Sequence, residues 1–154
     1  MFAYCNNNPI NYGDQEGYIP FRTTNVMMAD NGSCTILSNK VMSIANKEKY
    51  SKEKWDNSTI AQKKQLLEDE LSEVALAMNI PVSRKINYYS KEIKGTISYG
   101  SFLAETNAIY INEAVLENDA YSYHLLTTIR HEARHCYQHK AKNILDKQGC
   151  FSIC

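Results

Sequence analysis

The stretch IRHEARHCYQHK, residues 129–140, places two histidines four residues apart with a glutamate directly after the first. It belongs to a segment, from about residue 121 to 140, whose apolar spacing predicts one helix with Asp119 or Ser122 as its N-cap. The apolar stripe of this helix consists of Leu125, Leu126, Ile129, Ala133, Cys136 and Tyr137, and the nearly opposite face carries His124, His131 and His135. We therefore expect the stripe to pack on the core and the imidazoles to face a cleft or solvent.

The spacing of the two histidines fits a metal site. His131 and His135 are one helical turn apart, so both rings can reach a single ion without bending the backbone. Glu132 lies beside the same face and could take a proton from a metal-bound water instead of binding the metal. Solvated surface histidines are the alternative reading of the same pattern.

The residues before this helix predict an α+β fold. Residues 59–80 carry apolar side chains at helical spacing, Thr59 and Gln62 form a potential capping box, and Pro81 ends the helix. The apolar stripe of that helix is Ile60, Leu67, Leu71, Val74 and Met78. Runs rich in β-branched and aromatic residues follow at 85–89, 95–103 and 107–112. They predict a small antiparallel sheet whose last two strands form a hairpin, and a short helix is also expected within residues 36–57.

Length and composition narrow the function classes. A chain of 154 residues has room for one modest domain, and its 17 Lys plus Arg balance 17 Asp plus Glu. Without a basic run there is no electrostatic basis for binding nucleic acid or an anionic membrane, so a protein or peptide partner is expected. The five cysteines include no C-x-x-C pair, which favours free thiols. Neither a signal peptide nor a membrane span is predicted.

The order of helix, small sheet ending in AIYIN, and histidine-bearing helix resembles the zincin metallopeptidases over residues 58–140. More narrowly, IYINEAVLEN…LLTTIRHEARHCYQHK is similar to zincin-like domains at the ends of bacterial polymorphic toxins. Their motif extends to His-Glu-x-Arg-His-x-x-Gln, which Arg134 and Gln138 match. The resemblance implies that His131 and His135 bind Zn²⁺ and that Glu132 is the general base.

The same resemblance assigns a substrate-binding strand. In zincins an extended peptide pairs with an edge strand of the sheet, and the strand preceding the histidine-bearing helix takes that role here. The residues that the resemblance implies for this edge are Ala108, Ile109, Tyr110, Ile111 and Asn112.

A second resemblance concerns the N-terminal segment FAYCNNNPINYGDQEGYI, residues 2–19. It is similar to the end of the core region of RHS-repeat proteins, where Tyr-x-Tyr-x-x-Asn-Asn-Pro precedes an Asp-Pro-x-Gly turn. Gln15 stands where proline is usual, so self-cleavage at this turn is not predicted. The resemblance implies a C-terminal toxin module with a cognate immunity protein as partner. Such a module is either cytoplasmic in the producer or delivered as a secreted effector.

These resemblances divide the chain into three expected parts. Residues 1–19 would be the end of the RHS core, residues 20–57 a linker with a short helix, and residues 58–154 a zincin-like domain whose C-terminal part is incomplete. Catalytic zinc takes three protein ligands, and a metzincin would place its third histidine where Ala141 stands, which excludes that class. Asp146 is the sole acidic residue after the motif and the first candidate for the third ligand. Weaker candidates are His139, Cys150 and Cys154.

Two other functions stay open at this point. The chain could be a catalytically inactive, truncated zincin scaffold or a binding module that keeps weak metal affinity through two histidines. It could also be another hydrolase toxin such as a nuclease, against which the balanced charge counts.

Overall fold

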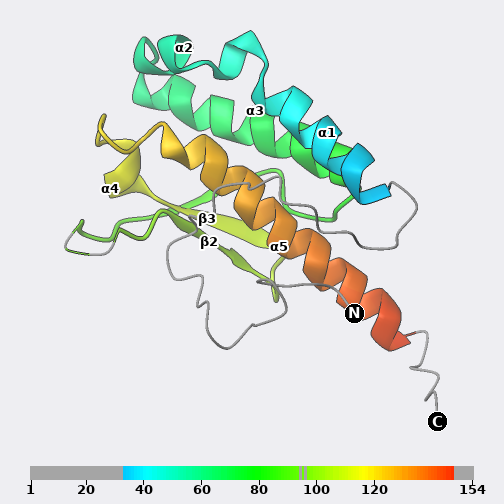
Figure 1. Ribbon diagram of the computed structural model, residues 1–154. Coiled ribbons are helices and arrows are strands. Elements are labelled where there is room, and N and C mark those ends of the chain that lie inside the picture. The colour runs from blue at the N-terminus through cyan, green and yellow to red at the C-terminus, as the bar shows by residue number, and fades with distance from the viewer. Residues whose placement is uncertain (1–32, 94, 96, 148–154) are drawn as a thin grey trace.

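The computed structural model describes residues 33–93, 95 and 97–147 (Figure 1). The RHS-like segment, residues 2–19, and the first part of the expected linker, residues 20–32, lie outside the described residues, as do residues 94, 96 and 148–154. The predictions for those segments are therefore not addressed by the fold.

The described chain is a mixed α+β structure, which confirms the α+β class that the sequence predicts (Figure 1). Its elements in chain order are α1 (Ser33–Ala45), the short 3-10 helix η2 (Glu48–Tyr50), α2 (Lys52–Asp56), α3 (Ile60–Met78), β1 (Asn87–Tyr89), β2 (Gly100–Leu103), β3 (Ala108–Asn112), α4 (Glu113–Leu116) and α5 (His124–Lys147). Among the described residues, no helix is both long enough and apolar enough to cross a membrane.

Helix α3 begins and ends where its sequence predicts. The Thr59 hydroxyl accepts from the Gln62 N–H at 3.3 Å and the Gln62 side chain accepts from the Thr59 N–H at 2.8 Å, so the capping box is formed. Asn79 ends the helix in the left-handed conformation, with φ of 51°. Of the predicted stripe, Leu67, Leu71, Val74 and Met78 are buried, whereas Ile60, the first helical residue, is 37% exposed.

The three strands form a sheet in the order β1-β3-β2. Strands β2 and β3 are antiparallel, as predicted, and Asn107 takes the left-handed conformation in the turn between them. The prediction of a wholly antiparallel sheet is wrong, because β1 pairs with β3 in parallel. After β1 the chain crosses to the opposite edge of the sheet, where it forms β2. It then returns through the hairpin, so β3 lies in the middle and runs parallel to β1.

Helix α5 is packed on two sides. Helix α3 lies along one side of it, and strands β2 and β3 lie on the other (Figure 1). Five of the six residues of its predicted apolar stripe are buried, and Tyr137 is 36% exposed. The polar face of α5 therefore meets the sheet. The expectation that the histidines on this face point to a cleft or solvent is not met where the strands cover the helix.

Polar contacts fix α5 against the helical layer. The Trp55 indole N–H donates to the Ser122 hydroxyl at 3.0 Å, just before α5 begins. Farther along, Arg130 donates to the carboxylate of Glu70 on α3 at 2.5 Å, and the Glu70 side chain is fully buried. Lys140 donates to the main-chain oxygen of Asn79 at the end of α3. These contacts hold α5 against the helical layer both before and after residues 131–135.

Candidate metal centre

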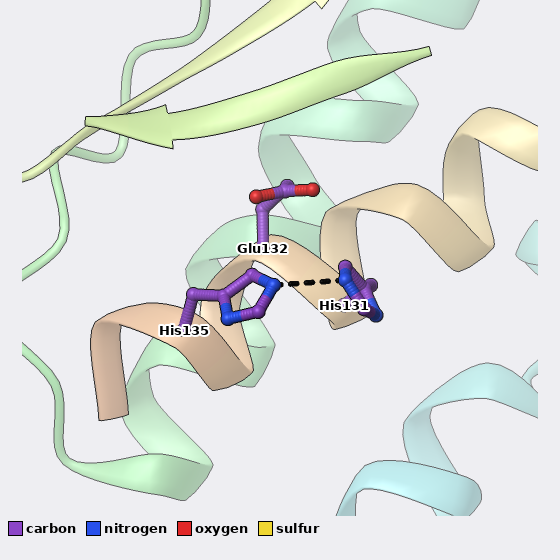
Figure 2. Close-up of side chains that lie close together, drawn as sticks. All are labelled: His131, Glu132 and His135. Carbon is purple, nitrogen blue, oxygen red and sulfur yellow. Dashed lines mark hydrogen bonds between the residues drawn. The ribbon is translucent and has the colours of Figure 1, made fainter. Parts of the chain in front are cut away.

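His131, Glu132 and His135 lie on adjacent turns of α5 beneath the sheet (Figure 2). His131 is 7% exposed and Glu132 is 5% exposed, while His135 is half-buried. The reading of His131 as a solvated surface histidine is therefore wrong. The predicted apolar stripe located one packed face of the helix, but β2 and β3 cover the opposite face as well.

The two imidazoles converge on a common point. The Nε2 atoms of His131 and His135 are 2.9 Å apart, and the rings meet edge to face with their centroids 4.5 Å apart (Figure 2). Two nitrogens that bind one zinc tetrahedrally at 2.0–2.1 Å would lie about 3.3 Å apart, so a small opening of this pair would accommodate the ion. The donor type and the spacing fit Zn²⁺.

The Glu132 carboxylate completes the cluster. Its oxygen and one nitrogen of each imidazole all lie within 4.8 Å of one another. Figure 2 shows the carboxylate pointing toward the strands while the two rings point toward each other. Among the described residues, this is the one group of three histidine, cysteine or acidic side chains close enough to hold a metal ion.

The predicted candidates for a third metal ligand all follow His135 in the sequence. Helix α5 continues without a break to Lys147, so the main chain of Asp146 lies eleven residues and about 16 Å farther along the axis than His135. The side chain of Asp146 and all of Cys150 and Cys154 lie outside the described residues. His139 is described, and its ring lies 6.3 Å from that of Phe102, outside the metal-binding group.

Cys136, although adjacent to His135, faces away from the cluster. It belongs to the apolar stripe and is fully buried in the core. Burial raises the pKa of the Cys136 thiol, which keeps it protonated and unsuited to bind a metal. It is a free cysteine with a packing role.

The strand assigned to substrate binding is not an edge. Strand β3, with Ala108, Ile109, Tyr110, Ile111 and Asn112, hydrogen-bonds to β1 on one side and β2 on the other. Its main-chain groups are already paired, so the prediction that residues 108–112 form the edge that pairs with a peptide is wrong. The sequence could not show this, because a buried central strand and a half-buried edge strand of five residues have similar compositions.

Asn112 instead holds the loop after β1. Its side-chain oxygen accepts from the main-chain N–H groups of Lys91 and Ala114, and its amide donates to the main-chain oxygens of Lys91 and Ser98. The side chain is 1% exposed. Asn112 therefore shapes the crossing from β1 to β2.

Strand β2 is the outer strand beside α5. Tyr99 packs edge to face on His124, with ring centroids 6.2 Å apart, and Phe102 lies over His139. Between them, a Cβ atom on Gly100 would lie 3.1 Å from Cγ2 of Thr128, one helical turn before Glu132. The strand thus follows the histidine face of α5, with His131, Glu132 and His135 between its two aromatic contacts.

The register of β2 directs some of its main-chain N–H and C=O groups away from β3, toward the outer edge of the sheet. The Asn112 N–H donates to the Tyr99 oxygen at 2.9 Å, and Ser101 pairs opposite Tyr110 two residues farther on. Because hydrogen-bonded pairs alternate in an antiparallel ladder, Gly100 and Phe102 direct their N–H and C=O groups away from β3. Among the described residues, no further strand pairs with this edge.

Arg134 makes a contact that the sequence reading missed as a functional feature. Its Nη2 atom lies 3.1 Å from Nδ1 of His131, whereas the Nε2 atom of the same ring faces His135. The i, i+3 spacing on a helix could have indicated this contact. Similarly, a glycine inside a predicted strand could have indicated the close approach of Gly100 to α5.

Comparisons with known proteins leave the chain without an assigned family. No family model matches it, no curated protein matches it, and no solved structure matches it.

Proposed function

We propose that the chain is a zinc-dependent, peptidase-like toxin domain that hydrolyses a peptide bond. The observation that carries the proposal is the convergence of the His131 and His135 Nε2 atoms, 2.9 Å apart, beside the buried carboxylate of Glu132. Neutral imidazole is a preferred zinc ligand, and a carboxylate next to the ion but outside its ligand set is suited to proton transfer.

The roles of the residues follow from their positions. His131 and His135 would hold the ion. Zinc held in this way would polarise a peptide carbonyl and make water more acidic. Glu132, which is 5% exposed, would take a proton from the attacking water and return it to the leaving amine nitrogen. Its burial beneath the sheet limits competition from bulk solvent for that proton.

The corrected sheet order supplies a binding mode for the substrate. An extended peptide could pair with the outward main-chain groups of Gly100 and Phe102 and would then lie along the histidine face of α5. Strand β2, rather than β3, would position the scissile bond. Such pairing recognises the main chain of the peptide. A preference for particular peptide sequences would therefore come from the protein side chains next to β2.

The toxin part of the proposal rests on other residues. The RHS-like segment, residues 2–19, and the extended motif with Arg134 and Gln138 support delivery as a toxin module with a cognate immunity protein. An immunity protein that blocks the site would have to cover the edge of β2 or the exposed part of His135.

The first test is metal content followed by hydrolysis. Protein purified without chelators should contain about one zinc per chain, and His135→Ala should lose it. Glu132→Gln should keep the zinc but lose at least about a hundredfold in the rate of cleavage of a peptide library, because it removes the proton acceptor without removing a ligand. Equal rates in the wild type and Glu132→Gln would contradict the proposed mechanism.

A second candidate is a zincin scaffold that does not cleave peptides. It is favoured by the contact between Arg134 and Nδ1 of His131 and by the fact that the described residues contain only two imidazole donors at the cluster. It predicts zinc well below one per chain and no peptide cleavage. A nucleic-acid substrate included in the same assay would identify a nuclease instead.

A further inference from the structure

The contact between Arg134 and His131 determines where the protons of the histidine pair lie. A guanidinium group has only N–H donors and does not lose a proton in proteins. With Nη2 of Arg134 at 3.1 Å from Nδ1 of His131, that ring nitrogen must act as the acceptor. An imidazole whose Nδ1 accepts carries its proton on Nε2.

The proton on Nε2 of His131 has a hydrogen-bond acceptor nearby. Nε2 of His135 lies 2.9 Å away, a normal length for a hydrogen bond between two ring nitrogens. His131 therefore donates from Nε2 to His135, and the two rings form an internally hydrogen-bonded pair. The nitrogens that face each other are the same two that would bind a metal ion.

This arrangement has the opposite polarity to that of an ordinary metal-bound histidine. There, the nitrogen away from the ion carries the proton and donates it to a carboxylate or a carbonyl oxygen. Here a cation occupies the position of that acceptor. For the Nε2 lone pair of His131 to bind a metal, its proton must move to Nδ1, where it would meet another donor.

We propose that Arg134 is a positioning residue that holds His131 in the tautomer of the metal-free pair, so that metal uptake requires the guanidinium to leave Nδ1. Arg134 thereby lowers the metal affinity of the site relative to that of the same two histidines without it. The inference about the metal rests on the proposed function, whereas the inference about the tautomer stands on the two distances alone. Arg134 is partly buried, so its departure would require a rotation of the side chain into a new position.

The tautomer is tested in metal-free protein. Long-range proton–nitrogen NMR correlations distinguish protonated from unprotonated ring nitrogens, and the wild type should show His131 protonated at Nε2 and unprotonated at Nδ1. In Arg134→Met, which keeps an unbranched apolar side chain but has no donor, the Nδ1-protonated form should appear. A wild-type His131 that carries its proton on Nδ1 would overturn the inference whether or not the chain binds metal.

Metal affinity is tested by chelator competition with zinc and with cobalt. Arg134→Met and Arg134→Gln should both bind about tenfold or more tightly than the wild type, the scale on which partners of metal-bound histidines act. Arg84→Met removes an exposed arginine elsewhere and should leave the affinity unchanged. Affinity that is equal or weaker in both Arg134 variants would overturn the role of Arg134 in metal uptake. Tighter binding without any peptide cleavage would contradict the proposed function but support this inference.

Discussion

At the scale of single residues, the least expected feature near the cluster is the buried carboxyl group of Glu70. Its Oε1 atom accepts from Arg130, the residue before His131, while no hydrogen-bond partner of Oε2 is found among the described residues. Removal from water raises the pKa of Glu70 to about 7, and Arg130 offsets only part of that cost. The pair connects α3 to α5 at the residue before His131.

This raised pKa predicts a pH-dependent stability with a definite sign. The pKa of Glu70 is near 4.5 in the unfolded chain, so the folded chain binds this proton more tightly. The stability that this proton contributes is fully present below pH 4.5 and is lost as the pH rises through about 7. Glu70→Gln removes this titration. Between pH 4.5 and 8 the free energy of unfolding of the wild type should therefore fall by on the order of 2–3 kcal/mol relative to the variant.

Urea denaturation at several pH values measures this difference. Asp69→Asn, which removes a neighbouring carboxylate that is not paired with Arg130, is the control for the loss of one negative charge on α3. If the wild type and Glu70→Gln run parallel across this range, the pKa of Glu70 in the folded chain is close to its value in the unfolded chain, and its burial is compensated more fully than the structure indicates.

At the scale of elements, the close approach of β2 to β3 and to α5 depends on Gly100. A Cβ atom at this position would lie 2.7 Å from the main-chain oxygen of Tyr110 and 2.8 Å from Cδ1 of Ile111. The first of these atoms belongs to the main chain of β3 and cannot rotate away. Gly100→Ala should therefore displace the strand and lower the free energy of unfolding by about 1–3 kcal/mol.

The same substitution tests whether β2 positions the substrate. Displacement of the strand should reduce peptide hydrolysis more than zinc content, because the histidines belong to α5 and the peptide would pair with β2. Ser101→Ala, at the exposed next position of the strand, serves as the matched control and should change neither property. Normal hydrolysis in a Gly100→Ala variant of reduced stability would remove β2 from the proposed binding mode.

The elements also show which parts of the structure were predictable. Helix α3 and the β2–β3 hairpin follow from interactions within a few residues, such as the capping box of Thr59 and the left-handed turn at Asn107. The order of the strands does not follow from such local interactions, because the pairing of β1 with β3 depends on the segment of about ten residues that connects β1 to β2. Asn112, which holds that crossing, contacts main-chain groups up to 21 residues away.

The candidate site was predictable to a similar extent. The convergence of His131 and His135 follows from one helical turn and is confirmed. The burial of His131 was not expected, because an apolar stripe identifies one packed face of a helix and carries no information about a sheet on the opposite face. The contact of Arg134 with Nδ1 of His131 depends on a side-chain rotamer, which spacing alone leaves undetermined.

At the scale of the whole molecule, the helical layer and the layer of α5 and the sheet share one core. Trp55, the single tryptophan, is fully buried between them. Its indole N–H donates to Ser122, and its ring meets Tyr123 edge to face with the centroids 6.2 Å apart. The Tyr123 hydroxyl in turn donates to the main-chain oxygen of Tyr50 at 3.1 Å.

A core shared in this way predicts a single cooperative unfolding transition. Tryptophan fluorescence reports on the junction of the two layers and far-ultraviolet circular dichroism on all helices, so the two curves should coincide in urea. Ser122→Ala leaves the buried indole N–H without its acceptor and should lower the free energy of unfolding by about 1–2 kcal/mol, moving both curves together. Ser43→Ala, which removes an exposed hydroxyl, is the control. A fluorescence transition at lower urea than the dichroism transition would mean that the layers separate before either unfolds, and the histidine pair would then depend on α5 and the sheet alone.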